Sequence, residues 1–152
     1  MKRTILLLGD PELYEVSEEV KIEELQQMKQ VQEDLKDTLL AFRARYGTGR
    51  AIAAPQIGVK KRVIYRHLDT PVLFINPRLT FPEQEMIDVL DDCMSFPDLL
   101  VRVKRYKRCI IYYKDLEWND CSMELEGDMS ELIQHEYDHL DGILATLRAV
   151  DE

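Results

Sequence analysis

Long hydrophobic runs are missing from this sequence. The opening residues, MKRTILLL, carry only a short apolar run before Gly9, Asp10 and Pro11. A secretory signal peptide needs a longer apolar core, and a membrane-spanning helix needs about 20 apolar residues in a row. The sequence therefore predicts a cytoplasmic protein without a leader and without a membrane partner.

Basic residues and cysteines are also scarce. The chain has 20 Lys and Arg residues against 29 Asp and Glu, which gives a formal net charge of −9. A surface that binds nucleic acid needs an excess of positive charge, so DNA is not expected as a partner. The three cysteines, Cys93, Cys109 and Cys121, are odd in number and follow no secretory signal. They argue against a disulfide framework and for a reducing compartment.

The sequence contains enough hydrophobic residues to form one hydrophobic core. Its 152 residues, 45% of them hydrophobic, suit a single domain over residues 1–152. From Ile22 to Tyr46 apolar residues recur at spacings of three and four. This periodicity predicts a long amphipathic helix that stops at Gly47 and Gly49.

Strands are expected in the middle of the chain and a second helix near its end. Four short segments rich in β-branched and aromatic residues predict antiparallel strands: Arg62–Tyr65, Val72–Asn76, Met86–Leu90 and Arg108–Tyr113. Helical periodicity returns at Asp128, with Glu131 three residues later as a predicted capping box. The fold class is therefore α+β.

The late helix carries QHEYDHLDG, residues 134–142, which contains the pattern HExxH. Residues i and i+4 lie on one helix face, so His135 and His139 can aim both imidazoles at one metal ion. Glu136 lies beside that pair and can reach a water molecule at the ion, as a general base would. The alternative is a chance pattern in a polar helix. Because two of the three histidines of the chain occupy the pattern, a metal site is favoured, and His67 is given no role.

Two histidines need a third protein ligand. The zinc-protease pattern HExxHxxGxxH matches as far as Gly142 but places its third histidine at Ala145, and few carboxylates follow His139. The third ligand is therefore expected upstream, where Cys93 in LDDCMSFPDL is the best candidate. The alternative role of an isolated cysteine is that of a small buried hydrophobic residue.

Three segments, in this order, resemble the peptide deformylase family. They are GRAIAAPQIG (residues 49–58), DDCMS (residues 91–95) and QHEYDHLDG, set against the family's GxGLAAxQ, EGCLS and QHExDHLxG. The likeness continues through GDPEL near the start, INP at residues 75–77 and SFP at residues 95–97, so it covers nearly the whole chain. It implies antiparallel β-sheets packed around a central C-terminal helix that carries HExxH, with the long amphipathic helix near the N-terminus.

The resemblance also implies roles for individual residues. Cys93, His135 and His139 correspond to the metal ligands, and Glu136 corresponds to the general base and acid. The family's ion is typically Fe²⁺, with Zn²⁺, Ni²⁺ or Co²⁺ as substitutes.

The same resemblance adds an oxyanion site and a substrate. The side-chain amide of Gln56 and the backbone N–H of Met94 correspond to the donors that face the developing oxyanion. The implied reaction removes the formyl group from the N-terminal formyl-methionine of nascent polypeptides and releases formate. The peptide would pair with Arg50–Ile52 as an added strand, and apolar side chains near the metal would accept the methionine.

The motifs depart from the family's pattern at five positions, and Ile52 and Met94, which each replace a leucine, are two of them. Ala51 replaces a glycine, and its methyl group narrows the groove unless the site needs only an extended backbone. Asp91 and Asp92 replace Glu and Gly, and Asp92 adds negative charge beside Cys93 unless it points to solvent. One alternative is therefore a deformylase-like protein that binds metal and peptide with reduced or lost activity. Another is a metalloprotease, against which Ala145 counts.

Two charged features have open roles. Asp138 is either a solvated carboxylate on the helix or a partner of Arg105 that orients the helix. Residues 102–108 alternate basic and apolar side chains, which predicts a strand with one solvated face. A transient contact with the ribosome is the alternative use of that basic face.

Overall fold

The computed structural model describes residues 1–149. Within that range the chain forms two α-helices, seven strands and several short 3-10 helices. Their bounds, in chain order, are η1 Pro11–Tyr14, η2 Ile22–Glu24, α1 Leu25–Tyr46, β1 Ala51–Ala53, η3 Ala54–Ile57, β2 Val63–Arg66, β3 Val72–Thr80, β4 Met86–Cys93, β5 Phe96–Tyr106, β6 Arg108–Lys114, β7 Asp120–Glu126, α2 Asp128–Leu140 and η4 Ala145–Arg148.

The long predicted helix is confirmed as α1, preceded by the single turn η2. It ends at Gly47, whose φ of 74° lies in the left-handed region and whose N–H donates to the carbonyl of Arg43. Glycine reaches that conformation without the steric cost of a Cβ. The apolar stripe of α1 packs against β1 and β2 through four buried side chains: Met28, Leu35, Leu39 and Phe42.

Two antiparallel sheets form the rest of the fold. One has the strand order β1-β2-β3-β6-β7, with β1 at its edge, and the other is a two-stranded ribbon of β4 and β5. The four predicted strands are confirmed as parts of β2, β3, β4 and β6, except that Arg62 precedes β2. The strand β7 is not predicted, because its half-buried positions Cys121 and Met123 carry less β propensity than the β-branched and aromatic residues of the other strands.

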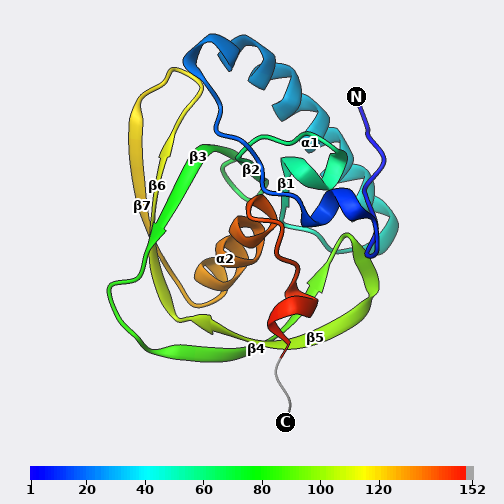
Figure 1. Ribbon diagram of the computed structural model, residues 1–152, viewed down its shortest axis with the longest axis vertical. Coiled ribbons are helices and arrows are strands. Elements are labelled where there is room, and N and C mark those ends of the chain that lie inside the picture. The colour runs from blue at the N-terminus through cyan, green and yellow to red at the C-terminus, as the bar shows by residue number, and fades with distance from the viewer. Residues whose placement is uncertain (150–152) are drawn as a thin grey trace.

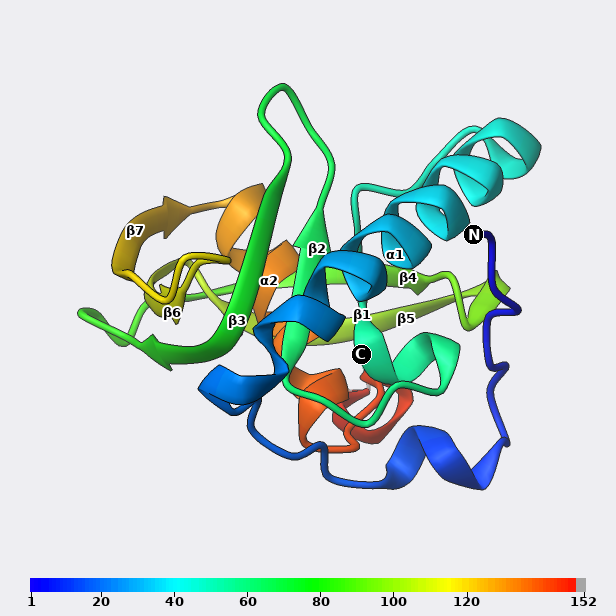
Figure 2. The same ribbon diagram turned by 90° about the horizontal axis from the view of Figure 1, so that it is seen from above.

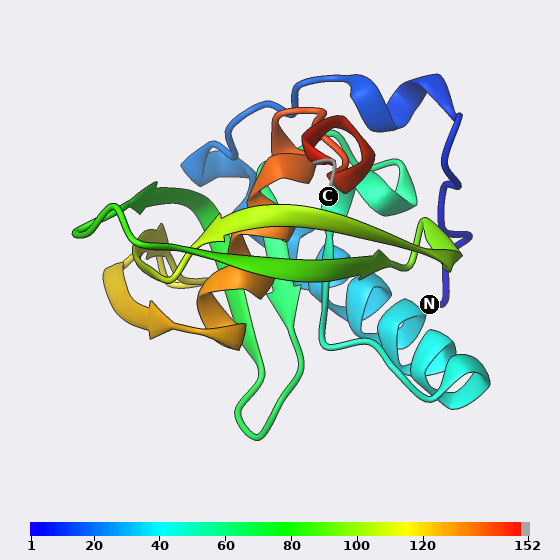
Figure 3. The ribbon, with the colours of Figure 1, turned by 90° about the horizontal axis from the view of Figure 1, so that it is seen from below.

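Helix α2 lies at the centre of the molecule, between the five-stranded sheet and the β4–β5 ribbon (Figure 1). Seen from below, the ribbon crosses α2 (Figure 3). Seen from above, α1 and β7 lie on opposite sides of the molecule (Figure 2). This arrangement confirms the α+β fold class. No helix within residues 1–149 combines the length and the apolar composition that a bilayer crossing requires.

The predicted capping box at the start of α2 is wrong. The helix begins at Asp128, but its N-cap residue is Gly127 and no side chain caps it. Glu131 instead turns inward, with 14% of its side chain exposed, toward Arg50. The three-residue spacing from Asp128 to Glu131 matches that of a capping box. Glu131 also lies one helical turn before His135, so its side chain shares the helix face that carries His135.

The end of α2 is held against the N-terminal segment by close backbone approaches. Gly142 has a φ of 72°, and a Cβ at this position would lie 2.5 Å from the carbonyl oxygen of Tyr14. The N–H of Ser17 donates to the carbonyl of Leu140 over 2.8 Å. Only a glycine allows this contact, which fixes the position of the helix that carries HExxH.

Candidate metal centre

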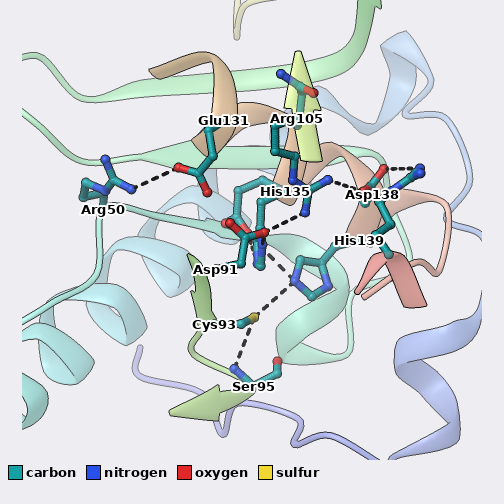
Figure 4. A network of polar contacts seen from close by, with 12 residues as sticks. Arg50, Asp91, Cys93, Ser95, Arg105, Glu131, His135, Asp138 and His139 are labelled. Atoms are coloured by element: carbon teal, nitrogen blue, oxygen red, sulfur yellow. Dashed lines mark hydrogen bonds and ion pairs between the residues drawn. The ribbon is translucent and has the colours of Figure 1, made fainter. Parts of the chain in front are cut away.

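Two parts of the fold bring Cys93, His135 and His139 together. Cys93 is the last residue of β4, and both histidines project from α2 toward it (Figure 4). Cys93 Sγ lies 3.3 Å from His139 Nε2, and one ligand atom from each of the three residues lies within 4.8 Å of the others. All three side chains are buried. One sulfur and two imidazole nitrogens form a donor set that suits Zn²⁺, Fe²⁺ and related divalent ions, so these residues fit a metal.

The carboxylate of Glu136 lies beside the same two imidazoles. Its Oε1 atom is 3.9 Å from His135 Nε2 and 4.0 Å from His139 Nε2, and the side chain is 3% exposed. Burial raises the pKa of Glu136 to about 7. A carboxyl group with a pKa near neutrality can both accept and donate a proton at physiological pH.

His135 is oriented by a buried carboxylate that the residue patterns did not single out. Its Nδ1 atom lies 2.9 Å from Asp91 Oδ2, which leaves Nε2 facing Cys93 and Glu136. A carboxylate on the far nitrogen fixes the tautomer and the ring orientation of a metal-binding histidine. The alternation of side chains along β4 could have identified this role, because it places Asp91 and Cys93 on the same face of the strand.

The network continues from Asp91 through two arginines. Arg105 lies 2.7 Å from Asp91 Oδ2 and 2.7 Å from Asp138 Oδ2, and Arg148 donates to Asp138 Oδ1 over 3.0 Å. Of the two roles considered for Asp138, the structure shows the partner of Arg105 and not the solvated carboxylate. The strand predicted at residues 102–108 is found only as far as Tyr106 in β5, because Arg108 already begins β6. Arg102 and Lys104 are exposed as expected, but Arg105 occupies an inward position. These contacts tie β4, β5 and the C-terminal segment to α2.

Asp91 and Glu131 form a carboxyl pair in which the two groups differ in pKa. Burial alone would raise the pKa of Asp91, but hydrogen bonds with His135, Glu131 and Arg105 hold it well below its usual range. Burial and the neighbouring Asp91 raise the pKa of Glu131 to about 8. Near neutral pH, Asp91 is therefore the charged member of the pair.

Gln56 reaches the metal centre from η3. Its Nε2 atom lies 3.4 Å from Cys93 Sγ and 3.1 Å from Ser95 Oγ, while its Oε1 atom accepts from the N–H of Ala53. Met94 follows Cys93 in the turn between β4 and β5 and is buried. Both residues singled out for the oxyanion therefore lie next to the candidate ligands, although spacing along the chain could not have linked Gln56 to them.

The positions that depart from the deformylase pattern differ in their surroundings. Asp92 is exposed whereas Asp91 is buried, so water screens the charge of the Asp92 carboxylate although this residue borders the cavity beside Cys93. Ala51 lies in β1 with its side chain buried, and its φ is not positive, so alanine adopts this backbone without strain. Neither residue obstructs the three candidate ligands.

A cavity opens beside Cys93, His135 and Glu136. Its wall includes residues from α1, β1, the β4–β5 turn and α2. The expected apolar side chains are present, but charged side chains line the cavity as well. These further lining residues are Phe42, Met94 and Leu132, which are apolar, and Arg50, Asp92 and Glu131, which are charged.

Arg105 should contribute strongly to stability because it links two buried carboxylates. Removing one partner from a buried ion pair leaves an uncompensated charge, so Arg105→Met is expected to lower the free energy of unfolding by about 3–5 kcal/mol. Urea denaturation of the metal-free proteins measures this change. The matched control is Lys104→Met on the same strand, where an exposed side chain lies 3.9 Å from Asp88. An exposed pair is worth about 1 kcal/mol or less. Equal effects of the two substitutions would contradict a structural role for the buried network.

Comparisons with known proteins identify the family and agree with the α+β fold. The sequence model of the polypeptide deformylase family matches residues 2–152. A peptide deformylase of Treponema pallidum is 37% identical over 148 residues, which cover 95% of this chain and 86% of the relative. The crystal structure of peptide deformylase from Thermotoga maritima superposes with a TM-score of 0.89 at 30% identity and covers 99% of both chains. An actinonin-bound deformylase from Acinetobacter baumannii superposes with a TM-score of 0.90 at 27% identity and also covers 99% of both chains.

Proposed function

The chain belongs to the peptide deformylase family and is a peptide deformylase, and from this premise we propose how its residues divide the reaction. Cys93, His135 and His139 hold one divalent metal ion, and residues 1–152 act as one metallohydrolase domain. Deformylases are metal-dependent, and the buried donor set of one thiolate and two imidazoles supports this assignment. We propose Fe²⁺ as the native ion, with Zn²⁺, Ni²⁺ or Co²⁺ as substitutes that the same donors accept. When bound, the ion would act as a Lewis acid on the formyl carbonyl and would lower the pKa of water.

Glu136 serves as general base and then as general acid. It takes a proton from the water molecule whose oxygen attacks the formyl carbon. It returns that proton to the amine nitrogen as the C–N bond breaks, which yields formate and a free N-terminus. The pKa of about 7 supports both transfers, because the group is neither fully ionised nor fully protonated near neutrality.

Gln56 and Met94 stabilise the negative charge that develops on the formyl oxygen. The amide of Gln56 is held by Ala53 through its oxygen, which leaves its N–H donors facing the Cys93 side of the site. The backbone N–H of Met94 is the second donor. Donors that are fixed before the reaction lose no free energy by reorienting during it.

The substrate is the formyl-methionyl end of a nascent polypeptide. Because β1 is the edge strand of its sheet, an extended peptide can add to it through backbone hydrogen bonds. We place this reaction in the cytoplasm, where a reducing environment keeps the Cys93 thiol free to bind metal. A transient contact with the ribosome would involve exposed basic side chains of β5 such as Lys104.

The observation that carries the proposal is the convergence of Cys93, His135 and His139 beside Glu136. Protein purified without oxygen should contain about one metal ion per chain, and this form should release formate from formyl-Met-Ala peptides. Metal analysis and a formate assay on the same sample test both expectations. Bound metal with peptide affinity but no formate would favour the alternative of a binding protein, and cleavage of internal peptide bonds would favour a protease.

A further inference from the structure

We propose that Arg50 and Glu131 determine side-chain specificity in the catalytic cavity. They favour a formylated peptide whose first side chain is unbranched, has the length of methionine and ends in a hydrogen-bond acceptor, as in methionine sulfoxide. This inference rests on the proposed function, because it concerns the substrate of that site. It goes beyond that function in assigning a preference that an apolar pocket would not show.

The cavity beside the metal centre is where the first side chain of the substrate must lie. The formyl group is bonded directly to the nitrogen of the first residue, so the Cα of that residue lies only two bonds from the carbon that reacts. Its side chain therefore starts within the cavity that Cys93, His135 and Glu136 line. Arg50 and Glu131 line the same cavity, on the sides formed by the start of β1 and by α2.

Glu131 belongs to the face of α2 that points at the metal centre. It precedes His135 by four residues, so the two side chains share one face of the helix. Figure 4 shows Arg50 reaching from its own segment toward Glu131, and Arg50 Nη2 lies 3.6 Å from Glu131 Oε2. At this distance the two groups attract each other without a close hydrogen bond. Among the described residues no other side chain is paired with the Arg50 guanidinium, so its donors are available to a substrate.

The burial of Glu131 is unfavourable in either protonation state unless its carboxyl group is hydrogen-bonded. Glu131 does not cap α2 and is not among the three candidate ligands. Its carboxyl contacts Asp91 on one side and approaches Arg50 on the other. A polar group kept at the wall of a catalytic cavity is typical of a site that recognises a polar substrate.

The polar wall of the cavity discriminates between substrate side chains of equal length. A purely apolar side chain displaces water from Arg50 and Glu131 and offers no hydrogen bond in return. A side chain that ends in an acceptor replaces that water with a bond to the guanidinium. Sites built to hydrogen-bond a substrate discriminate strongly against analogues that lack the partner, and a bond to a charged group corresponds to about a 10- to 100-fold preference.

The test compares two peptides that differ little in size, formyl-norleucine-Ala-Ser and formyl-methionine sulfoxide-Ala-Ser. For each protein the measured quantity is the ratio of kcat/KM for the sulfoxide to kcat/KM for the norleucine peptide. We expect the double variant Arg50→Leu/Glu131→Leu to lower this ratio about tenfold or more relative to wild type. Glu131→Gln keeps the wall polar and should preserve most of the preference. Arg45→Leu, which removes a basic side chain outside this cavity, should leave the ratio unchanged.

A second readout separates this inference from the proposed function. The products methionine sulfoxide-Ala-Ser and norleucine-Ala-Ser can be titrated calorimetrically into wild type and the double variant, and this measurement needs no turnover. An unchanged ratio of affinities and of kcat/KM in the double variant would overturn the specificity role while leaving deformylation intact. Absence of formate from every peptide, with the binding preference still lost in the double variant, would contradict the proposed function and support the specificity role.

Discussion

Replacing Glu136 with glutamine is expected to lower kcat/KM for formyl-Met-Ala peptides by about 10²- to 10⁴-fold. Glutamine keeps the shape of the side chain and its place near the two imidazoles. It can neither accept a proton from water nor deliver one to the leaving amine. Since the proposed metal ligands are untouched, the metal content should remain that of wild type, and this separates loss of proton transfer from loss of the ion.

The control for this substitution is Glu124→Gln on the exposed side of β7, which also removes one carboxylate charge. Steady-state formate release and metal analysis on both variants provide the comparison. If Glu136→Gln retained more than about a tenth of the wild-type kcat/KM, the acid–base role of Glu136 would be rejected, because positioned proton transfer contributes at least about 10²-fold.

Replacing Cys93 with alanine is expected to remove both metal binding and activity. Cys93 supplies the only sulfur of the donor set, and a site reduced to two imidazoles loses the ligand that sits on the opposite wall from α2. Metal content after purification should fall well below one ion per chain. Competition with a chelator should show an affinity reduced by about 10²-fold or more, since even residues that only support a ligand contribute about 10- to 100-fold.

Cys109→Ala is the matched control, because it also removes a buried thiol. Cys109 is 1% exposed and packs with the sheet and α2, away from the three candidate ligands. This variant should lose some stability through the cavity it creates and still bind metal as wild type does. Wild-type metal affinity in Cys93→Ala would show that the sulfur is not a ligand.

Local patterns in the sequence were sufficient to predict the main elements of the fold. The three- and four-residue spacing of Leu35, Leu39 and Phe42 predicts α1, because a helix repeats every 3.6 residues. The i, i+4 spacing of His135 and His139 predicts that the two imidazoles share one side of α2. Both features depend on neighbours along the chain, so no knowledge of tertiary structure is needed.

Local patterns do not predict the contacts between segments that are distant in the sequence. Cys93 and His139 are 46 positions apart, and only the crossing of the ribbon over α2 brings them together. Only the family resemblance identifies Gln56, since its place beside Cys93 depends on packing of η3 against the ribbon. The capping-box prediction for Glu131 is wrong because it depends on a short-range pattern, whereas the neighbours of Glu131 in the fold, Arg50 and Asp91, lie far away in the sequence.

The length of β1 has a consequence for the range of chains that this enzyme can process. With only three residues, Ala51–Ala53, the edge strand offers backbone partners to a very short stretch of an incoming polypeptide. In the proposed pairing with β1, residues beyond that stretch would form no main-chain ladder with the sheet. A binding strand this short would contact only the first residues of a substrate, so the proposed reaction would depend little on the rest of the polypeptide sequence.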